Sequence, residues 1–216
     1  MAELKRLVAG FRAFRATYFE QRPELFKGLA ARGQQPRVLV VACSDSRVDP
    51  AILLNAQPGD LFIIRNVANL IPPYQPDGHY HGTSAALEFG VCQLGVKHVI
   101  VLGHSQCGGI RALRSACVDH IPTGEFITPW VSLVSAPCCG GKDPNCEHAA
   151  GMSPLELEQF AVKTSLDNLM TFPWVAERVQ DGRLACHGWW FDLEKGALFE
   201  YGAAEARFRL LAGEGN

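Results

Sequence analysis

The chain has 216 residues, of which 48% are hydrophobic and 19% are charged, and its formal net charge at pH 7 is −2. This length suits one domain with a sizeable core, and the composition is that of a folded protein rather than a disordered one. The charge predicts no nucleic-acid partner and no anionic membrane partner, and no apolar run approaches the roughly 20 residues that span a bilayer. Because the N-terminal residues mix charged and apolar side chains, unlike a signal peptide, we expect a cytoplasmic protein.

The first part of the chain is expected to be helical. Residues 2–32 read as two helical segments with a break near Pro23. Five apolar residues recur at helical spacing and form one stripe: Leu4, Leu7, Val8, Phe11 and Phe14. The stripe is short, so we expect it to pack on protein rather than on membrane. We therefore predict an N-terminal helical arm over residues 1–36 and an α/β domain over residues 37–212.

Strands and helices alternate after the arm. Continuously apolar runs predict buried parallel strands over residues 37–43, 60–66 and 98–104. A helical pattern over residues 82–96 separates the last two, and another helix is expected to begin at residues 108–109. The predicted fold class is α/β, with a mostly parallel central β-sheet flanked by helices.

The second half of the chain is expected to contain a loop, two helices and a hairpin. SAPCCGGKDPNCEHAAG, residues 135–151, is rich in glycine and proline and predicts a loop. Ser153 and Glu156 have the spacing of a capping box that opens a helix to about residue 170, and a further helix covers residues 173–182. The segments 183–192 and 197–202 predict a hairpin at the edge of the sheet.

Two predicted strands end in residues that bind metals. Cys43 follows the first strand, and His104 and Cys107 follow the third within GHSQCGG. In open α/β sheets ligands bind at the carboxyl ends of the strands, so these side chains are expected to converge. Two thiolates and one imidazole suit zinc, and three protein ligands leave a fourth position open, as in catalytic zinc sites.

A carboxylate and a guanidinium lie next to the first cysteine. Arg47 would keep Asp45 ionised and turned away from the metal, so that the carboxylate accepts a hydrogen bond from a zinc-bound hydroxide. A structural ion pair is the plainer interpretation of this spacing, and only the position beside Cys43 favours a catalytic role. In the alternative, Arg47 is disengaged, Asp45 is the fourth ligand, and the zinc is purely structural.

ACSDSRV (42–48) together with GHSQCGGI (103–110) resembles the paired signature of the β-class carbonic anhydrases. The segments 57–74 and 81–91 and the late ACHGWWFDLEKG are similar to the same family. The resemblance implies a lyase with one Zn²⁺ per subunit that catalyses the zinc-hydroxide-mediated, reversible hydration of carbon dioxide to bicarbonate and a proton. Cys43, His104 and Cys107 match the family's zinc ligands, and Asp45 and Arg47 match its catalytic dyad.

The same resemblance implies a set of substrate-binding residues. Gln34 matches a glutamine that binds substrate in plant-type members, Phe62 and Val67 match apolar residues of the carbon dioxide pocket, and Gly108 matches a backbone donor near the bound anion. Phe89 stands where plant-type members have tyrosine, so a hydroxyl is missing from that contact.

Subgroup and assembly are also implied by the resemblance. Val40 stands where the bicarbonate-inhibited subgroup has tryptophan, so we expect plant-type behaviour, with activity at neutral pH and no cooperative inhibition by bicarbonate. A homodimer or higher homo-oligomer is implied, in which the N-terminal helices embrace the partner and Gln34 serves the partner's zinc. The apolar stripe of the arm supports this, because it needs a covering surface.

Two further questions stay open from the sequence. Some relatives act on carbon disulfide or carbonyl sulfide, and access to the pocket decides between these linear molecules and carbon dioxide. The cluster Cys138, Cys139, Cys146 and His148 could form a second zinc site, but adjacent cysteines rarely bind one metal together, so a loop without metal is preferred. Phosphatase chemistry is excluded, because neither Cys43 nor Cys107 has an arginine six positions on.

Overall fold

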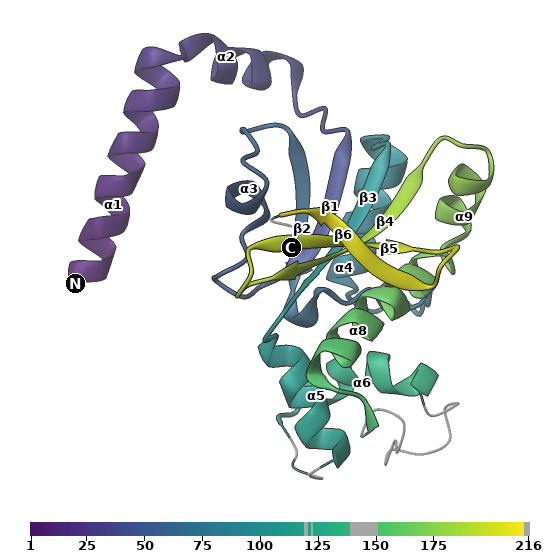
Figure 1. Cartoon of the computed structure of the whole chain (residues 1–216). Helices are drawn as coiled ribbons and strands as arrows, with labels where there is room; N and C mark the ends of the chain where they lie inside the picture. The colour runs from purple at the N-terminus through teal and green to yellow at the C-terminus, as the bar shows by residue number, and fades with distance from the viewer. Residues whose placement is uncertain (119–120, 122, 139–150, 214–216) are drawn as a thin grey trace. The chain divides into compact units, whose positions relative to one another are not determined.

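The computed structural model describes residues 1–118, 121, 123–138 and 151–213 of the chain (Figure 1). These residues form two compact units, Met1–Gln35 and Pro36–Asn216. Within the described ranges, no helix combines the length and the apolar character needed to cross a membrane.

The N-terminal unit is helical throughout most of its length. Helix α1 covers Ala2–Arg15, a π-helical segment η1 covers Ala16–Gln21, and α2 covers Pro23–Arg32. Pro23 begins α2, where its missing N–H costs no helical hydrogen bond. Aromatic rings of η1 and α2 pack together, with the centroids of Phe19 and Phe26 4.7 Å apart. Much of the predicted stripe is exposed, at 67% for Leu4 and 60% for both Leu7 and Phe11.

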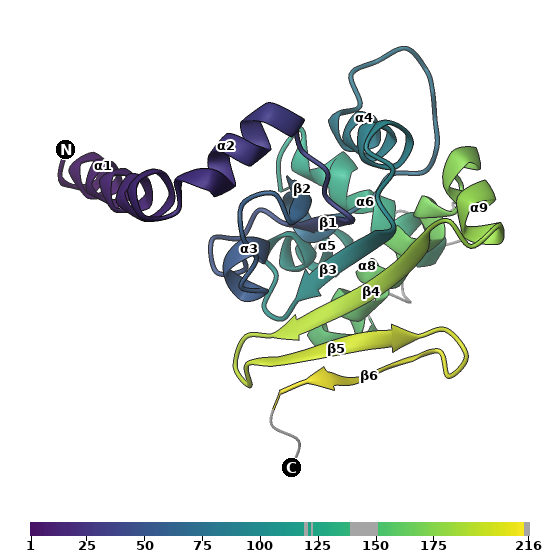
Figure 2. The same cartoon turned by 90° about the horizontal axis from the view of Figure 1, so that it is seen from above.

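The second unit is built on one six-stranded sheet with the order β2-β1-β3-β4-β5-β6 (Figures 1 and 2). Its strands are β1 Val38–Cys43, β2 Leu61–Asn66, β3 His98–His104, β4 Ala185–Asp192, β5 Ala197–Gly202 and β6 Arg207–Ala212. The pairs among β2, β1, β3 and β4 are parallel, whereas β5 and β6 pair antiparallel. The predicted fold class, a mostly parallel sheet with flanking helices and an N-terminal helical segment, is therefore confirmed.

Alternate residues of the central strands are buried on opposite faces of the sheet. Leu39 and Val41 of β1 pack in one core cluster with residues of helices α4 (Gly82–Glu88), α8 (Pro154–Leu169) and α9 (Pro173–Gln180). Val40 and Ala42 point to the other face, where they pack near Leu53 of α3 (Pro50–Leu53). Because both faces are covered, these strands are continuously apolar in sequence.

Parts of the second half of the chain differ from the prediction. The hairpin at the sheet edge is a three-stranded meander, because β6 adds to β5. All residues of β6 except Phe208 are exposed, and its two arginines suit an edge strand. Helix α6 (Ile127–Cys138) includes the first residues of the predicted loop, since the buried Val131 and Val134 anchor it. Cys139, Cys146 and His148 lie outside the described residues.

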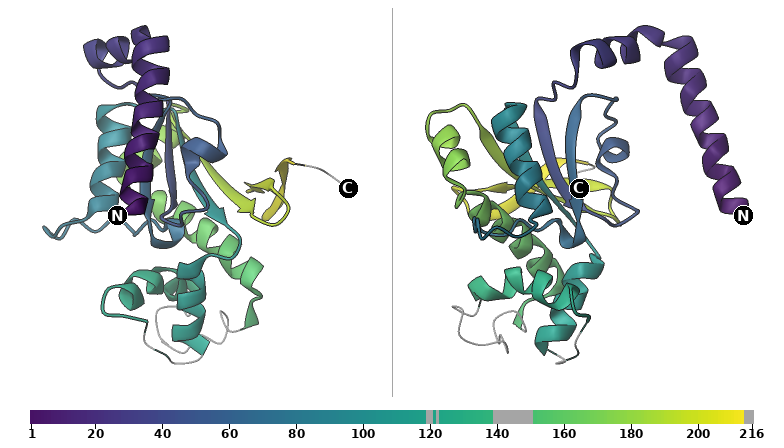
Figure 3. Two further views of the ribbon diagram at one scale, coloured as in Figure 1. Left: turned by 90° about the vertical axis from the view of Figure 1, so that its left-hand side faces the viewer. Right: turned by 180° about the vertical axis from the view of Figure 1, so that it is seen from behind.

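The remaining predicted helices are present. The helix after β2 consists of α4 followed by the π-helical segment η3 (Phe89–Gln93). The capping box of α8 is formed as predicted: Ser153 Oγ accepts the N–H of Glu156, and Glu156 Oε2 accepts the N–H of Ser153. Helices α5 (Gly108–Val118) and α6 lie beyond the end of the sheet at which β3 stops (Figure 3).

Candidate metal centre

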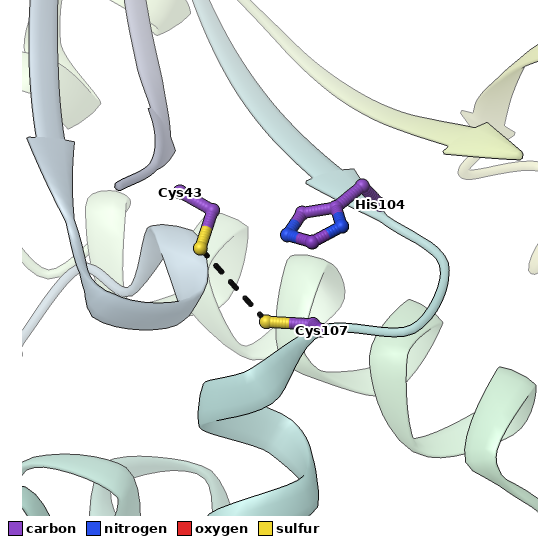
Figure 4. Close-up of side chains that lie close together, drawn as sticks. All are labelled: Cys43, His104 and Cys107. Carbon is purple, nitrogen blue, oxygen red and sulfur yellow. Dashed lines mark hydrogen bonds between the residues drawn. The ribbon is translucent and has the colours of Figure 1, made fainter. Parts of the chain in front are cut away.

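Three side chains converge at the carboxyl end of the parallel strands, and Figure 4 shows them pointing toward one another. Cys43 is the last residue of β1, His104 is the last residue of β3, and Cys107 directly precedes α5. Their ligand atoms all lie within 4.8 Å of one another. All three residues are buried, with exposed fractions of 4% or less. The structure thus brings together the three metal ligands proposed from the sequence.

The distances and hydrogen bonds of this group fit a tetrahedral zinc ion. The two sulfur atoms are 3.9 Å apart, and two thiolates at the usual zinc–sulfur bond length in a tetrahedron are separated by about 3.8 Å. Nδ1 of His104 lies 2.8 Å from the carbonyl oxygen of Ser105, which can only accept, so the ring carries its proton there. Nε2 of His104 is buried and has no hydrogen-bond partner among the described residues. An unprotonated nitrogen that faces two thiols is a ready metal ligand.

The protonation of the two thiols also favours binding of a cation. A hydrogen bond from Cys107 lowers the pKa of Cys43, and the same contact together with burial raises the pKa of Cys107. The first proton therefore leaves the pair easily, whereas the second is retained because two buried thiolates repel each other. The positive charge of a metal ion between the sulfur atoms offsets this repulsion, so both cysteines can bind it as thiolates.

Asp45 and Arg47 form a closed ion pair beside the metal group. Arg47 donates from Nε to Oδ1 of Asp45 at 2.9 Å and from Nη2 to Oδ2 at 2.7 Å. The hydrogen bond from this guanidinium is the main reason that the pKa of Asp45 lies well below its usual value. Among the described residues, the metal group does not include the Asp45 carboxylate. In this conformation Asp45 is therefore not the fourth ligand of the alternative prediction.

Arg65 holds the loop that carries the dyad, a role that the sequence did not reveal. It extends from β2 and donates from Nε to the carbonyl of Cys43 at 3.0 Å and from Nη2 to the carbonyl of Asp45 at 2.7 Å. Its Nη1 also pairs with Asp49 at 2.8 Å, and Asp49 caps the N-terminus of α3. The two contacts with carbonyl oxygens fix the backbone on both sides of Ser44, and the third ties the loop to the start of α3.

The turn between His104 and Cys107 is held from several sides. Gln106 has a positive φ of 58°, which is unfavourable for a residue with a side chain. Arg47 Nη2 donates to the carbonyl of Gln106 at 3.1 Å, and Glu158 Oε1 accepts the N–H of Cys107 at 3.2 Å. Burial raises the pKa of Glu158, which is only 6% exposed. The sequence offers one sign of this contact, because Glu158 lies on the apolar face of the helix predicted over residues 153–170.

The predicted substrate-binding residues do not all meet in one chain. Phe62 and Phe89 lie together, with ring centroids 5.9 Å apart. However, Phe62 pairs with Leu39, which is four residues before Cys43 on β1, and four residues of a strand span about 13 Å. Phe62 packs against the core cluster of Leu39 rather than the cluster that contains Cys43 and Cys107, and Phe89 is 45% exposed.

Two other predicted residues do lie close to the metal group. Val67 packs against the cluster that contains Cys43 and Cys107. Gly108 follows Cys107 and begins α5, with no heavy atom nearer than 3.8 Å to the position of a Cβ. Gln34 belongs to the N-terminal unit, Met1–Gln35.

Comparison with known proteins identifies the family of this chain. The family model for carbonic anhydrases matches residues 38–198. A carbonic anhydrase of Pseudomonas aeruginosa is 39% identical over 211 residues, which cover 97% of this chain and 92% of that protein. Beta carbonic anhydrase 3 of Arabidopsis thaliana is 39% identical over 197 residues, with coverages of 90% and 75%. The chain belongs to the β-class carbonic anhydrases.

Solved structures agree with this assignment. The β-carbonic anhydrase CcaA superposes with a TM-score of 0.80 at 31% identity, over 99% of this chain and 94% of that one. A chain from the crystal structures of two tetrameric β-carbonic anhydrases of Sordaria macrospora gives a TM-score of 0.76 at 28% identity. The match covers 94% of this chain and 98% of that one. The resemblance noted in the sequence is therefore confirmed at the level of family and fold.

Proposed function

We propose that this protein is a zinc-dependent lyase that catalyses the reversible hydration of carbon dioxide to bicarbonate and a proton. The observation that carries the proposal is the buried group of Cys43, His104 and Cys107, in which Nε2 of His104 faces the two sulfur atoms and has no hydrogen-bond partner in the described part of the chain. These residues would hold one tightly bound Zn²⁺ per subunit and leave one position open. Bound zinc supplies the positive charge that makes water a nucleophile near neutral pH.

The dyad orients the nucleophile in this proposal. The carboxylate of Asp45 accepts a hydrogen bond from the attacking water, so that a lone pair of the water oxygen faces the carbon of the substrate. Arg47 keeps this carboxylate ionised and fixes its direction through two hydrogen bonds. The backbone N–H of Gly108 donates to an oxygen of the anionic product. The hydrogen bonded to Asp45 stays in the bicarbonate, and the other hydrogen of the water leaves to buffer as a proton. A new water then replaces bicarbonate.

We infer that the apolar part of the pocket is shared between subunits. Val67 belongs to the same chain as the metal ligands and packs in their cluster. Phe62 pairs with Leu39, about 13 Å along β1 from Cys43, and the ring of Phe89 lies beside that of Phe62, so in this proposal both rings contribute to a pocket of a second copy, together with Gln34. Tetrameric relatives support a homo-oligomer, and a dimer is the smallest assembly that completes the pocket.

The proposal also covers the subgroup of the family and the compartment in which the protein works. The closed Asp45–Arg47 pair and the buried Val40 support plant-type behaviour without bicarbonate inhibition. A site that depends on two free thiols supports a reducing compartment such as the cytoplasm.

Stopped-flow hydration of carbon dioxide by the zinc-loaded protein, at pH 7.0 and 8.5, tests the function. We expect substantial turnover at both values and no sigmoidal loss of rate when bicarbonate is added. Cys43→Ala should lose zinc and turnover together, whereas Cys186→Ala, which removes a thiol outside the metal group, should keep both. A stoichiometrically zinc-loaded protein that hydrates no carbon dioxide would refute the proposal.

A further inference from the structure

Two histidines lie side by side at the other end of the sheet from the metal centre. His98 is the first residue of β3, and His187 lies on the neighbouring strand β4. Nδ1 of His98 is 3.2 Å from Nε2 of His187. His98 precedes the metal ligand His104 by six residues on the same strand, which corresponds to about 20 Å. The histidine pair is therefore separate from the proposed active site.

A carboxylate orients the inner histidine of the pair. Nδ1 of His187 lies 3.3 Å from Oε1 of Glu200 on β5, and Nε1 of Trp189 donates to the same oxygen at 3.4 Å. An ionised carboxylate only accepts, so His187 carries its proton on Nδ1 and turns the lone pair of Nε2 toward His98. A carboxylate on one ring nitrogen and a free lone pair on the other is the usual arrangement of a histidine that binds a metal.

The backbone positions of these side chains are fixed by strand pairing, and the side chains are partly exposed to solvent. Ile100 pairs with His187 in the β3–β4 ladder, and Glu200 pairs with Trp189 in the β4–β5 ladder. The side chain of His187 is 29% exposed and that of Glu200 is 26% exposed, while His98 is more exposed than either. A partly hydrated ion can therefore approach the pair.

We propose that His98 Nδ1 and His187 Nε2 together bind a divalent first-row transition-metal ion, for which Glu200 positions His187. Two nitrogen ligands of a tetrahedral ion lie about 3.3 Å apart at the usual bond lengths, close to the observed 3.2 Å. Without metal, His98 donates its Nδ1–H to Nε2 of His187. On metal binding this proton moves by way of water to Nε2 of His98, so the neutral pair releases no net proton. Imidazole suits zinc and nickel, and water completes the coordination. The site takes metal in excess of the tightly held zinc, and it does not depend on the proposed catalytic function.

Nickel titration of the zinc-loaded full-length protein tests this site, because Ni²⁺ binds imidazole and is distinguishable from the resident zinc. Calorimetry is run on the wild type and on His98→Gln, His187→Gln and Glu200→Gln. His81→Gln is the matched control, since His81 also pairs with a carboxylate, at 2.6 Å from Asp77, but in an exposed loop. We expect both substitutions in the pair to abolish one Ni²⁺ site, Glu200→Gln to weaken it about tenfold, and His81→Gln to leave it unchanged.

A second measurement does not depend on the folding of any variant. Paramagnetic Ni²⁺, added below one equivalent to the wild type, should broaden the imidazole NMR signals of His98 and His187 before those of other histidines. Equal nickel binding by the wild type and both pair variants would overturn the proposal. Broadening that starts at other histidines would do the same.

Discussion

Arg47 binds both carboxylate oxygens of Asp45, with its backbone N–H and Nε on Oδ1 and its Nη2 on Oδ2. The chain contains a second pair with the same spacing, in which the backbone N–H and Nε of Arg183 bind the two oxygens of Asp181. That pair lies just before β4, at the end of the sheet opposite the metal ligands. An aspartate and an arginine two residues apart thus form this contact outside the site as well, and proximity to Cys43 is what distinguishes the proposed dyad.

Asp45→Asn should keep the metal and lose most of the turnover. The amide is nearly the same size, but it has one acceptor oxygen and no charge, so it orients the nucleophile poorly. We expect kcat to fall by about 100-fold, the lower range for a positioned acid–base group. Zinc content and stopped-flow rates check this, with Asp181→Asn as a control that retains the wild-type rate. Equal rates in the two variants would disprove the role of the dyad.

Arg65→Lys should loosen the loop that carries Cys43 and Asp45. Lysine keeps the charge but offers a single nitrogen in place of the three that bind two carbonyls and Asp49. Leaving these partly buried acceptors unpaired should cost about 1 kcal/mol of unfolding free energy, the lower end of the range for buried groups, and the zinc should dissociate faster. Urea unfolding and zinc transfer to a chelator measure both effects. Arg209→Lys on the edge strand, whose ion pair with Glu205 is exposed, should behave as the wild type. An equal loss of stability and zinc retention in the two variants would contradict the role of Arg65 in holding the loop.

The adjacent glycines at the start of α5 should respond differently to alanine. A Cβ on Gly109 would lie 2.7 Å from Val67 Cγ1 and 2.9 Å from Ala68 Cβ, so the segment after β2 would have to move. We expect Gly109→Ala to lower the free energy of unfolding by about 1–3 kcal/mol, the usual range for overpacking, and to weaken zinc retention. Gly108→Ala meets nothing within 3.4 Å and should unfold like the wild type. Similar denaturation midpoints for both variants would contradict this close packing.

The metal ligands were predictable from the sequence because local rules place them. Apolar runs identify the parallel strands, and parallel strands bring Cys43 and His104 to the same edge whatever the loops do. The supports of the site were not predictable in this way. Glu158 lies 51 residues after Cys107, so its contact with that backbone depends on how α8 packs. The positive φ of Gln106 is likewise imposed by partners from other elements.

The substrate pocket shows a different limit of sequence reasoning. Phe62 and Phe89 are near each other, but one chain does not bring them to the metal ligands. Their predicted role depends on the relation between two copies, which the order of residues along one chain does not encode locally. The edge strand β6 escaped prediction for a similar reason, since this mostly exposed segment becomes a strand only by pairing with β5.

The apolar stripe of α1 should hold subunits together. Leu7 and Phe11 are both 60% exposed, and covering two such side chains is worth several kcal/mol per subunit, at about 1.5–3 kcal/mol for each. The double substitution Leu7→Glu and Phe11→Glu places charges in that contact. We expect light scattering after size exclusion to show a smaller species, and hydration activity to fall with it, because Gln34, Phe62 and Phe89 then no longer complete a partner's pocket.

The matched control uses the opposite side of the same helix. Ala9 and Ala13 are exposed and lie about 180° around the helix from the stripe, so Ala9→Glu with Ala13→Glu adds the same charge without touching it. This variant should keep the mass and activity of the wild type. If both double variants keep the wild-type mass, the stripe is not an assembly surface. If the stripe variant becomes monomeric yet fully active, the pocket is complete within one chain and the shared-pocket proposal is wrong.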